Sequence, residues 1–153
     1  MRRKMILDII KDNPGIGFNG ISRHSKLSNG VVSHYILQLL KNDEITKSGI
    51  RAKYFLKDIP IKHRELIIIL STPTNFRIIK VLLEKKIPLK TKNISELIGK
   101  SLSTVSISLK NMEKASIINR TIMNEESKLT SDIGFSISNR SFVEKIISKY
   151  NLN

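Results

Sequence analysis

The chain contains no cysteine, few aromatic residues and no long hydrophobic run, and each absence excludes a class of protein. Without cysteine, the 153 residues can form no disulfide, no Cys-ligated zinc or iron–sulfur site and no cysteine nucleophile. Aromatic residues make up 5% of the chain, too few for an RNA-binding platform of stacking side chains. The longest apolar run, Leu66 to Leu70, is far shorter than the ~20 residues of a membrane span, so we expect no membrane segment.

Acidic residues are also scarce, and the resulting charge points to a polyanionic partner. The chain has 27 Lys and Arg against 13 Asp and Glu, a net charge of +14, divided as +7 in residues 1–72 and +7 in residues 73–153. The even division indicates two basic folded halves rather than a basic tail. Nucleic acid is the commonest such partner, an anionic membrane surface comes second, and a basic surface that only aids solubility is the third alternative.

The sequence lacks the patterns that enzymes need. His24, His34 and His63 lie apart with no metal-ligand spacing, and we find no acid/base carboxylate pair, nucleophile elbow or phosphate loop. We therefore expect no enzymatic activity, no cofactor and no metal. Asp8 interrupts the apolar start of the chain and no cleavage site follows, so we expect mature protein that is cytoplasmic and nucleoid-associated.

An internal repeat organises the chain. With Val32 placed on Val105, an offset of 73, a single ungapped register aligns apolar with apolar positions over about 40 residues. The other matched pairs are Ile6 with Ile79, Ile9 with Leu82, Ile21 with Ile94, Ser33 with Ser106, Ile36 with Leu109, Leu39 with Met112 and Ile45 with Ile118. The chain therefore holds two copies of one unit.

Each copy is predicted to be three helices followed by a β-hairpin. Apolar spacing, turn residues and caps place the first copy's elements at Arg2–Lys11, Phe18–His24, a helix capped by Ser28, and strands Glu44–Ser48 and Ala52–Leu56 around Gly49. In the second copy we expect a helix Asn75–Lys85, a short helix capped by Asn93 with Glu96, a helix from Ser101 or Ser103, and strands Ile117–Met123 and Ile133–Ser138. Ile61–Leu70 is predicted to be a helix between the copies, buried where the two halves meet, and Ser141–Tyr150 a final amphipathic helix.

This order resembles winged helix-turn-helix proteins. The segments LSNGVVSHYILQLL and STVSISLKNMEKASII are similar to the recognition-helix segment of the arsenic-repressor and multiple-antibiotic-resistance-regulator families. With NPGI before Phe18 and a wing ending in RAKYFL, the chain looks most like archaeal-type transcription regulators with two such domains, over residues 3–57 and 67–138. It departs from those families at Asp43 and Ser116, where many members have Gly, and at Val31, where they have Thr.

The resemblance implies a fold class and a domain division. The expected fold is mainly α with small β-hairpin wings (α+β): two tandem winged helix-turn-helix domains plus a C-terminal amphipathic helix. The domains are residues 1–58, a linker helix at 59–72, and residues 73–153.

In this fold the third helix enters the major groove of DNA and the wing lies on phosphates. Winding the helix from Val32 at 100° per residue turns a polar face outward, and its predicted base contacts are Asn29, Gly30, His34 and Gln38. The predicted phosphate contacts are Arg23, Lys26, Ser33, Lys41, Lys47, Arg51 and Lys53. An ordinary solvated helix face is the alternative for the first set, and local capping or packing is the alternative for Ser33.

The second copy is expected to read DNA less well. Its DNA candidates are Ser103, Thr104, Lys110, Asn111, Lys114 and Arg120, but Ile107 lies at the centre of the same face. Glu125 and Glu126 at the wing tip would repel phosphate, with Lys128 nearby as an offset. The second copy therefore binds DNA more weakly or serves dimerisation or partner contact.

The last helix has an apolar stripe that fits either a homodimer or its own domain. The stripe consists of Phe142, Val143, Ile146, Ile147 and Tyr150.

The sequence thus predicts a sequence-specific regulator of transcription that binds double-stranded DNA. Two alternatives remain: a protein–protein module of a transcription-initiation or chromosome-organising complex, and an architectural DNA binder without sequence preference.

Overall fold

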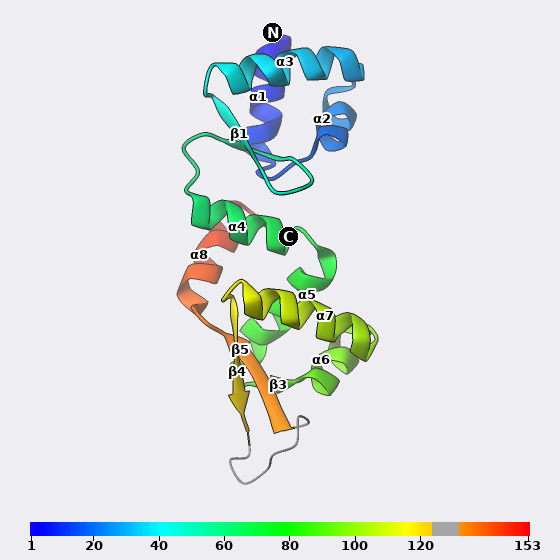
Figure 1. The fold of residues 1–153 in the computed structure, drawn as a ribbon, viewed down its shortest axis with the longest axis vertical. Helices are drawn as coiled ribbons and strands as arrows, with labels where there is room; N and C mark the ends of the chain where they lie inside the picture. The colour runs from blue at the N-terminus through cyan, green and yellow to red at the C-terminus, as the bar shows by residue number, and fades with distance from the viewer. Residues whose placement is uncertain (124–131) are drawn as a thin grey trace. The chain divides into compact units, whose positions relative to one another are not determined.

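A computed structural model describes residues 1–123 and 132–153 of the chain, which divides into two compact units. Unit 1 is Met1–Ile68 and unit 2 is Ile69–Asn153. Figure 1 traces the helices and strands of each unit. The expected fold, mainly α with small antiparallel sheets, is confirmed.

Unit 1 is a three-helix bundle followed by a β-hairpin. Its elements are α1 (Arg2–Asp12), α2 (Phe18–Ser25), α3 (Asn29–Lys41), β1 (Ile45–Ser48) and β2 (Lys53–Leu56). The two strands are antiparallel, with Lys47 opposite Tyr54, and Gly49 takes a positive φ of 83° in the turn between them. An isolated antiparallel β-bridge also pairs Ile16 with Tyr54, so the chain at Ile16 lies beside β2.

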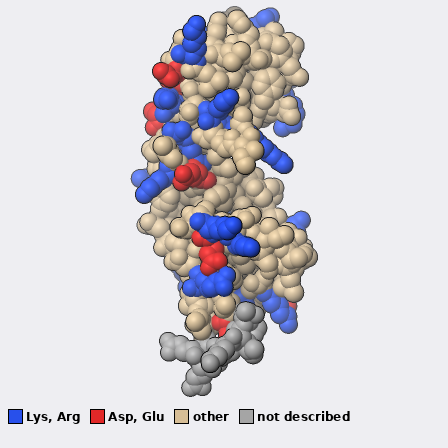
Figure 2. All heavy atoms as spheres, viewed as in Figure 1, with Lys and Arg blue, Asp and Glu red and all other residues tan. Residues whose placement is uncertain are grey.

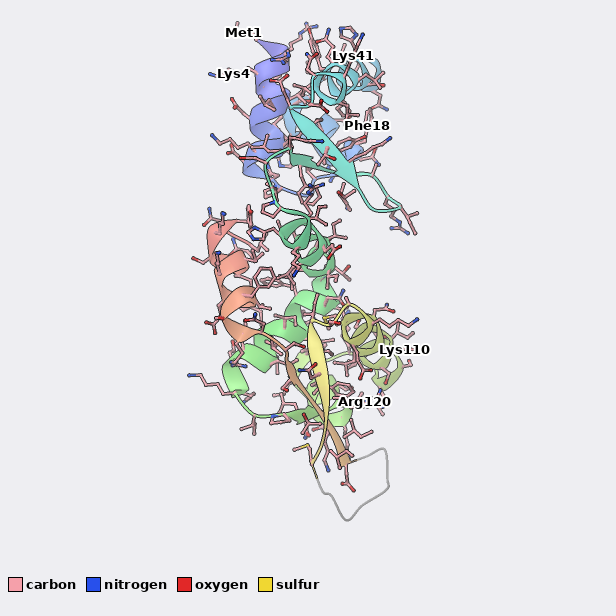
Figure 3. The ribbon with its side chains drawn as sticks, turned by 60° about the vertical axis from the view of Figure 1, so that its left-hand side comes forward. Met1, Lys4, Phe18, Lys41, Lys110 and Arg120 are labelled. Atoms are coloured by element: carbon pink, nitrogen blue, oxygen red, sulfur yellow. The ribbon has the colours of Figure 1, made fainter. Side chains whose placement is uncertain are left out.

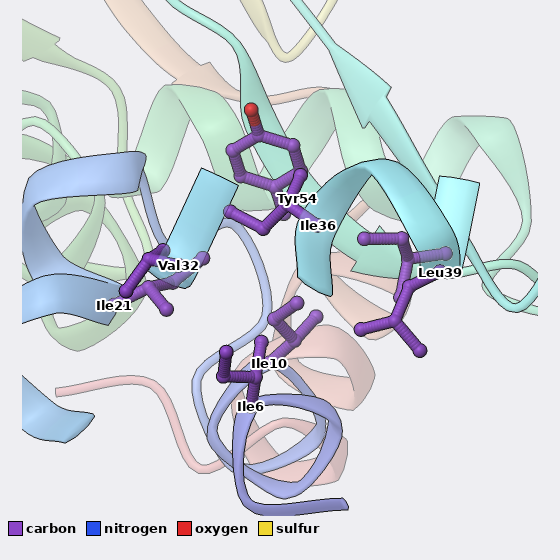
Figure 4. Close-up of a cluster of buried hydrophobic side chains, with 8 residues drawn as sticks. Ile6, Ile10, Ile21, Val32, Ile36, Leu39 and Tyr54 are labelled. Carbon is purple, nitrogen blue, oxygen red and sulfur yellow. The ribbon is translucent and has the colours of Figure 1, made fainter. Parts of the chain in front are cut away.

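The core of unit 1 lies where the three helices meet, as Figure 4 shows. Val32 and Leu39 of α3 are fully buried and Ile36 is nearly so, and they pack with Ile6 and Ile10 of α1. Each side chain buried to this extent contributes roughly 1.5–3 kcal/mol of transfer free energy. The spacing i, i+4, i+7 of the three α3 residues places them on one side of the helix, so the opposite side of α3 remains exposed.

Unit 2 has the same order of elements, with one strand and one helix added. Its elements are α5 (Pro73–Lys85), β3 (Leu89–Lys90), α6 (Thr91–Ile98), α7 (Leu102–Lys114), β4 (Ile118–Ile122), β5 (Ile133–Ile137) and α8 (Arg140–Lys149). The strands form one antiparallel sheet in the order β3-β5-β4.

The predicted start of the short helix in unit 2 was wrong. Asn93 lies inside α6 rather than at its cap, and the N-cap is Lys90 in extended backbone conformation. The reason is tertiary: Leu89 and Lys90 pair with Phe135 and Gly134 of β5, and this pairing holds the chain extended up to the first residue of the helix. A strand of two residues has no periodicity that a sequence pattern could reveal.

The second and third helices of the two units begin and end 73 residues apart, the offset predicted from the sequence repeat. Adding 73 to the bounds of α2 and α3 gives those of α6 and α7, and the caps Ser28 and Ser101 correspond in the same way. Each cap hydroxyl accepts a hydrogen bond from the backbone three residues later, from Val31 N–H and Thr104 N–H respectively.

Asp43 and Ser116, where many members of the resembled families have Gly, both have a left-handed backbone conformation. Their φ angles are +56° and +61°. After α7, Ser116 N–H donates to the carbonyl of Glu113 and Ile117 N–H donates to that of Met112. This pair of bonds is the Schellman motif, in which glycine is preferred because it has no Cβ. The same two bonds follow α3, so both units carry a strained side chain at this position.

Helix α4 (Ile61–Leu70) follows β2, as predicted, and three residues of its apolar run are buried, namely Leu66, Ile67 and Leu70. A Cβ added at Gly15 would lie 3.2 Å from Ile67 Cγ2 and 3.4 Å from Phe55 Cζ. Ile67 therefore packs against the backbone of Gly15 in unit 1.

Replacing Ser116 by glycine should stabilise the protein, because glycine removes the Cβ strain at φ +61°. We expect the free energy of unfolding of Ser116→Gly to rise by about 0.5–1 kcal/mol in urea titrations. Ser116→Ala is the matched control and should give no gain, because alanine keeps the Cβ. A loss of stability in the glycine variant would contradict this account.

Candidate nucleic-acid interface

The outward face of α3 presents a row of polar side chains. Asn29, Gly30, His34 and Gln38 are all exposed, while Val32, Ile36 and Leu39 on the opposite face are buried. Gly30, His34 and Gln38 follow one another at intervals of four residues, which places them along one line of the helix surface. The structure thus gathers all four predicted base contacts on one surface.

Two hydrogen bonds order this face. The Ser22 hydroxyl of α2 donates to Asn29 Oδ1 at 3.1 Å, and this bond does not use the donors of the Asn29 amide NH₂. One turn apart on α3, Gln38 Nε2 and His34 Nε2 lie 3.3 Å from each other. Side chains ordered before binding lose less conformational entropy when a ligand binds. The Ser22 contact was not predicted, because it joins two helices across a turn.

Gly30 leaves the start of α3 open. A Cβ added at Gly30 would meet no atom within 4 Å, so nothing within the protein requires glycine there. An open glycine in the first turn of an exposed helix lets a ligand approach the backbone closely.

The hairpin of unit 1 carries the three predicted wing cations in different settings. Lys47 and Arg51 are exposed, whereas Lys53 is half-buried, with its Nζ 4.0 Å from the position of a Cβ at Gly17. Lys53 therefore lies beside the start of α2. Opposite Lys47, burial raises the pKa of the Tyr54 hydroxyl above its usual value, so this side chain stays neutral.

The remaining predicted phosphate contacts of unit 1 are exposed on α2, on α3 and in the turn between them. These are Arg23, Lys26, Ser33 and Lys41. Lys26 has a φ of +59° at the C-terminus of α2, in the turn that leads to α3. In Figure 2, Lys and Arg side chains lie on both units in the face shown, with acidic side chains between them.

In unit 2, α7 exposes a different set of side chains at the corresponding positions. The offset of 73 places Leu102 on Asn29, Ile107 on His34 and Asn111 on Gln38. Leu102 is 54% exposed and Ile107 63%. The predicted candidates Ser103, Thr104, Lys110, Asn111 and Lys114 are exposed as well, but aliphatic groups interrupt the polar row.

A groove of about 950 Å³ lies beside α7 and the strands of unit 2. Its lining includes Lys90, Lys92, Lys110, Lys114 and Arg120 above a floor that contains Leu109 and Phe135. Figure 3 shows Lys110 on α7 and Arg120 on β4. Sequence reasoning missed Lys90 and Lys92, because β3 was not predicted and β3 is what brings them beside α7.

Arg120, a predicted DNA contact, forms a bidentate ion pair in this groove. Its Nε and Nη2 donate to Glu113 at 2.9 and 3.0 Å, and its guanidinium lies 5.8 Å from the Phe135 ring centre. This pairing makes Arg120 less available to a phosphate than an unpaired cation. The predicted wing-tip residues Glu125, Glu126 and Lys128 lie outside the described residues.

The C-terminal stripe is divided between buried and half-buried side chains. Val143 and Ile146 are buried within the chain, while Phe142, Ile147 and Tyr150 are half-buried. The Arg140 guanidinium donates to the carbonyls of Leu82 and Leu83, which ties the start of α8 to the end of α5.

The described part of the chain, residues 1–123 and 132–153, contains neither a cluster of metal ligands nor a single membrane-spanning helix. No group of three His, Cys, Asp or Glu side chains there could hold a metal ion. In the same part of the chain no single helix is long and apolar enough to cross a membrane, and the pair α4 and α5, bent by 101°, meets that test by length and composition only.

Two solved structures are similar to this chain at low identity. The DIP2311 protein from Corynebacterium diphtheriae is 12% identical with a TM-score of 0.33, over 89% of this chain and 26% of that one, so this chain spans about a quarter of its length. ScpB from Mycobacterium tuberculosis is 10% identical with a TM-score of 0.36, over 95% and 94%. At these TM-scores neither structure bears on the function of this chain.

The N-terminal segment matches a known family. No curated protein sequence matches the chain. Residues 2–46, however, match the family model described as winged helix-turn-helix DNA-binding, which spans α1, α2, α3 and the first residues of β1. The match covers the helix whose outward face carries Asn29, His34 and Gln38. The chain therefore has a winged helix-turn-helix DNA-binding domain at its N-terminus.

Proposed function

We propose that the protein is a sequence-specific regulator of transcription, built from two winged helix-turn-helix domains in tandem. The observation that carries the proposal is the ordered polar face of α3, within a segment that matches a DNA-binding family. The domains are residues 1–58 and 73–153, joined by a linker at 59–72 that contains α4. The second domain is supported by the repeated helix bounds and caps of unit 2.

In the proposed complex, α3 enters the major groove with its N-terminal half against base edges. Asn29 and Gln38 can each pair with adenine through two hydrogen bonds, and His34 can donate or accept at a base edge. The exposed cations Lys47 and Arg51, together with Lys53, contact the flanking phosphates, which adds affinity without sequence preference.

Unit 2 takes a lesser part in reading DNA. Leu102 and Ile107 replace polar groups on its α7, and Arg120 is held by Glu113. A homodimer through Phe142, Ile147 and Tyr150 of α8 would double the basic surface and suit a two-fold operator. Val143 and Ile146, buried within the chain, would support that surface rather than form it.

A binding titration separates this proposal from an architectural role. We expect the protein to bind duplex DNA from its own upstream intergenic region about 10³-fold more tightly than a scrambled duplex of equal length, at physiological salt. Fluorescence anisotropy over a salt series is the measurement. Equal affinity for both duplexes with a steep salt dependence would indicate that only phosphates are read.

Substitutions on α3 should reduce the preference between duplexes. His34→Ala and Gln38→Ala remove hydrogen bonds to bases, each worth about 1–3 kcal/mol of discrimination. We expect affinity for the native duplex to fall by about 5- to 150-fold while affinity for the scrambled duplex changes little. An equal loss on both duplexes would mean that these side chains do not read bases. Asn111→Ala, the counterpart of Gln38 in unit 2, is the matched comparison and should reduce the preference less, because unit 2 takes the lesser part in reading DNA.

Substitutions in the unit 1 wing should act on both duplexes alike. Replacing Lys47, Arg51 and Lys53 together by Ala removes three phosphate contacts and should make the negative slope of log affinity against log salt shallower by about 2.7. The matched unit 2 variant replaces Lys110, Lys114 and Arg120 by Ala and should lose less affinity. Equal losses from the two variants would contradict the division of labour between the units.

A further inference from the structure

The two recognition-type helices expose opposite chemistry at equivalent positions. Where α3 carries Asn29 and His34, α7 carries Leu102 and Ile107, more than half exposed. An aliphatic side chain cannot form the hydrogen bonds by which Asn or His recognises a base. Removing such surface from water is favourable, but it requires a ligand with apolar groups of its own.

Apolar side chains also line the wing side of the groove in unit 2. Along β4, side chains alternate between faces, so Arg120 and Ile122 share one face, and their partners on β5 are Phe135 and Ile133. Ile133 lines the groove and Ile122 is 60% exposed on the same face. Leu102 lines the groove from α7. The groove is therefore bordered by an aliphatic side chain on each side, Leu102 of α7 and Ile133 of β5, and Ile122 extends the second of these borders on β4.

The rim of the groove is cationic and largely uncompensated. Lys92, Lys110 and Lys114 are exposed and form no ion pair with another residue in 1–123 or 132–153. Lys90 and Arg120 are paired with Asp132 and Glu113. In unit 1 the residues that correspond to Lys92 and Lys110 are Asn19 and Leu37, whereas Lys114 and Arg120 correspond to Lys41 and Lys47. Lys92 and Lys110 are therefore the free rim cations that unit 2 does not share with unit 1.

We propose that this groove of unit 2 binds an acidic amphipathic helix of a partner protein. Such a helix places apolar side chains at i, i+3, i+4 and i+7 against Leu102, Ile122 and Ile133, while its acidic side chains reach the lysines of the rim. A DNA backbone would satisfy the lysines, but it would cover these aliphatic side chains with hydrated phosphates and gain nothing from burying them. The proposal does not depend on DNA reading by unit 1.

The probe is a synthetic, fluorescein-labelled helical peptide of about 18 residues, with Leu on one face and Glu on the others. A scrambled peptide of the same composition has the same charge but no apolar face. Fluorescence anisotropy with the full-length protein should show the amphipathic peptide bound at least about tenfold more tightly than the scrambled one. Equal affinity for the two peptides, or no binding of either, overturns the proposal.

Variants locate the binding surface. One variant, Leu102→Ser with Ile122→Thr, removes aliphatic side chains from both sides of the groove. The other, Lys110→Glu with Lys114→Glu, reverses the charge of the rim. Each double substitution should reduce the affinity for the amphipathic peptide at least about tenfold. Ile87→Thr is the matched control, since Ile87 is 61% exposed in unit 2 but neither lines the groove nor pairs, as Ile122 does, with a strand residue that lines it. This variant should bind the peptide as tightly as the parent protein. Circular dichroism checks that each variant is folded. Unchanged peptide binding in the two folded double variants places the peptide elsewhere and overturns the assignment.

The same variants distinguish this proposal from a DNA site. The Leu102→Ser, Ile122→Thr variant should retain the affinity of the parent protein for the upstream duplex within about twofold. Displacement of the peptide by the scrambled duplex, together with a loss of DNA affinity in this variant, would assign the groove to DNA instead. Failure of the upstream duplex to bind at all would overturn the DNA-reading proposal for unit 1 and leave the peptide result unaffected.

Discussion

Burial of Val32, Ile36 and Leu39 against α1 and α2 determines what unit 1 can do. These three side chains fix the rotation of α3 about its own axis, because turning the helix would expose aliphatic surface and bury polar groups without partners. The polar face is exposed as a consequence of the core rather than by any interaction of its own. Ser28 then fixes where the helix begins, which places Asn29 and Gly30 in its first turn.

The two units show how one core supports two surfaces. Val105, Leu109 and Met112 in α7 repeat the buried stripe of α3, so the helix is held in the same way and its opposite face is again exposed. The exposed positions carry little of the folding energy, because surface side chains away from caps and strained positions contribute little to stability. They can therefore differ at little cost to the fold, as Leu102 and Ile107 differ from Asn29 and His34.

The charge of the molecule has to be interpreted locally for the same reason. Each half of the chain carries +7, yet the cations of the two halves differ in exposure and in ion pairing. Lys47 and Arg51 are exposed on the unit 1 hairpin. Arg120, which the offset of 73 matches to Lys47, is instead paired with Glu113 in unit 2. The net charge indicates an anionic partner, and the neighbours of each cation decide which of them is available to that partner.

The sequence alone determined the order of the helices, the cap of α3 and the repeat, because these depend on interactions between residues close in the chain. The spacing of Val32, Ile36 and Leu39, the hydroxyl of Ser28 and the offset of 73 can all be read without coordinates. Only the tertiary structure decided the features that join distant segments. The pairing of Leu89 with Phe135 set the start of α6, and the convergence of Lys90 and Lys92 with α7 formed the groove. Leu89 and Phe135 are 46 positions apart (135 − 89), and no local periodicity specifies a contact over such a separation.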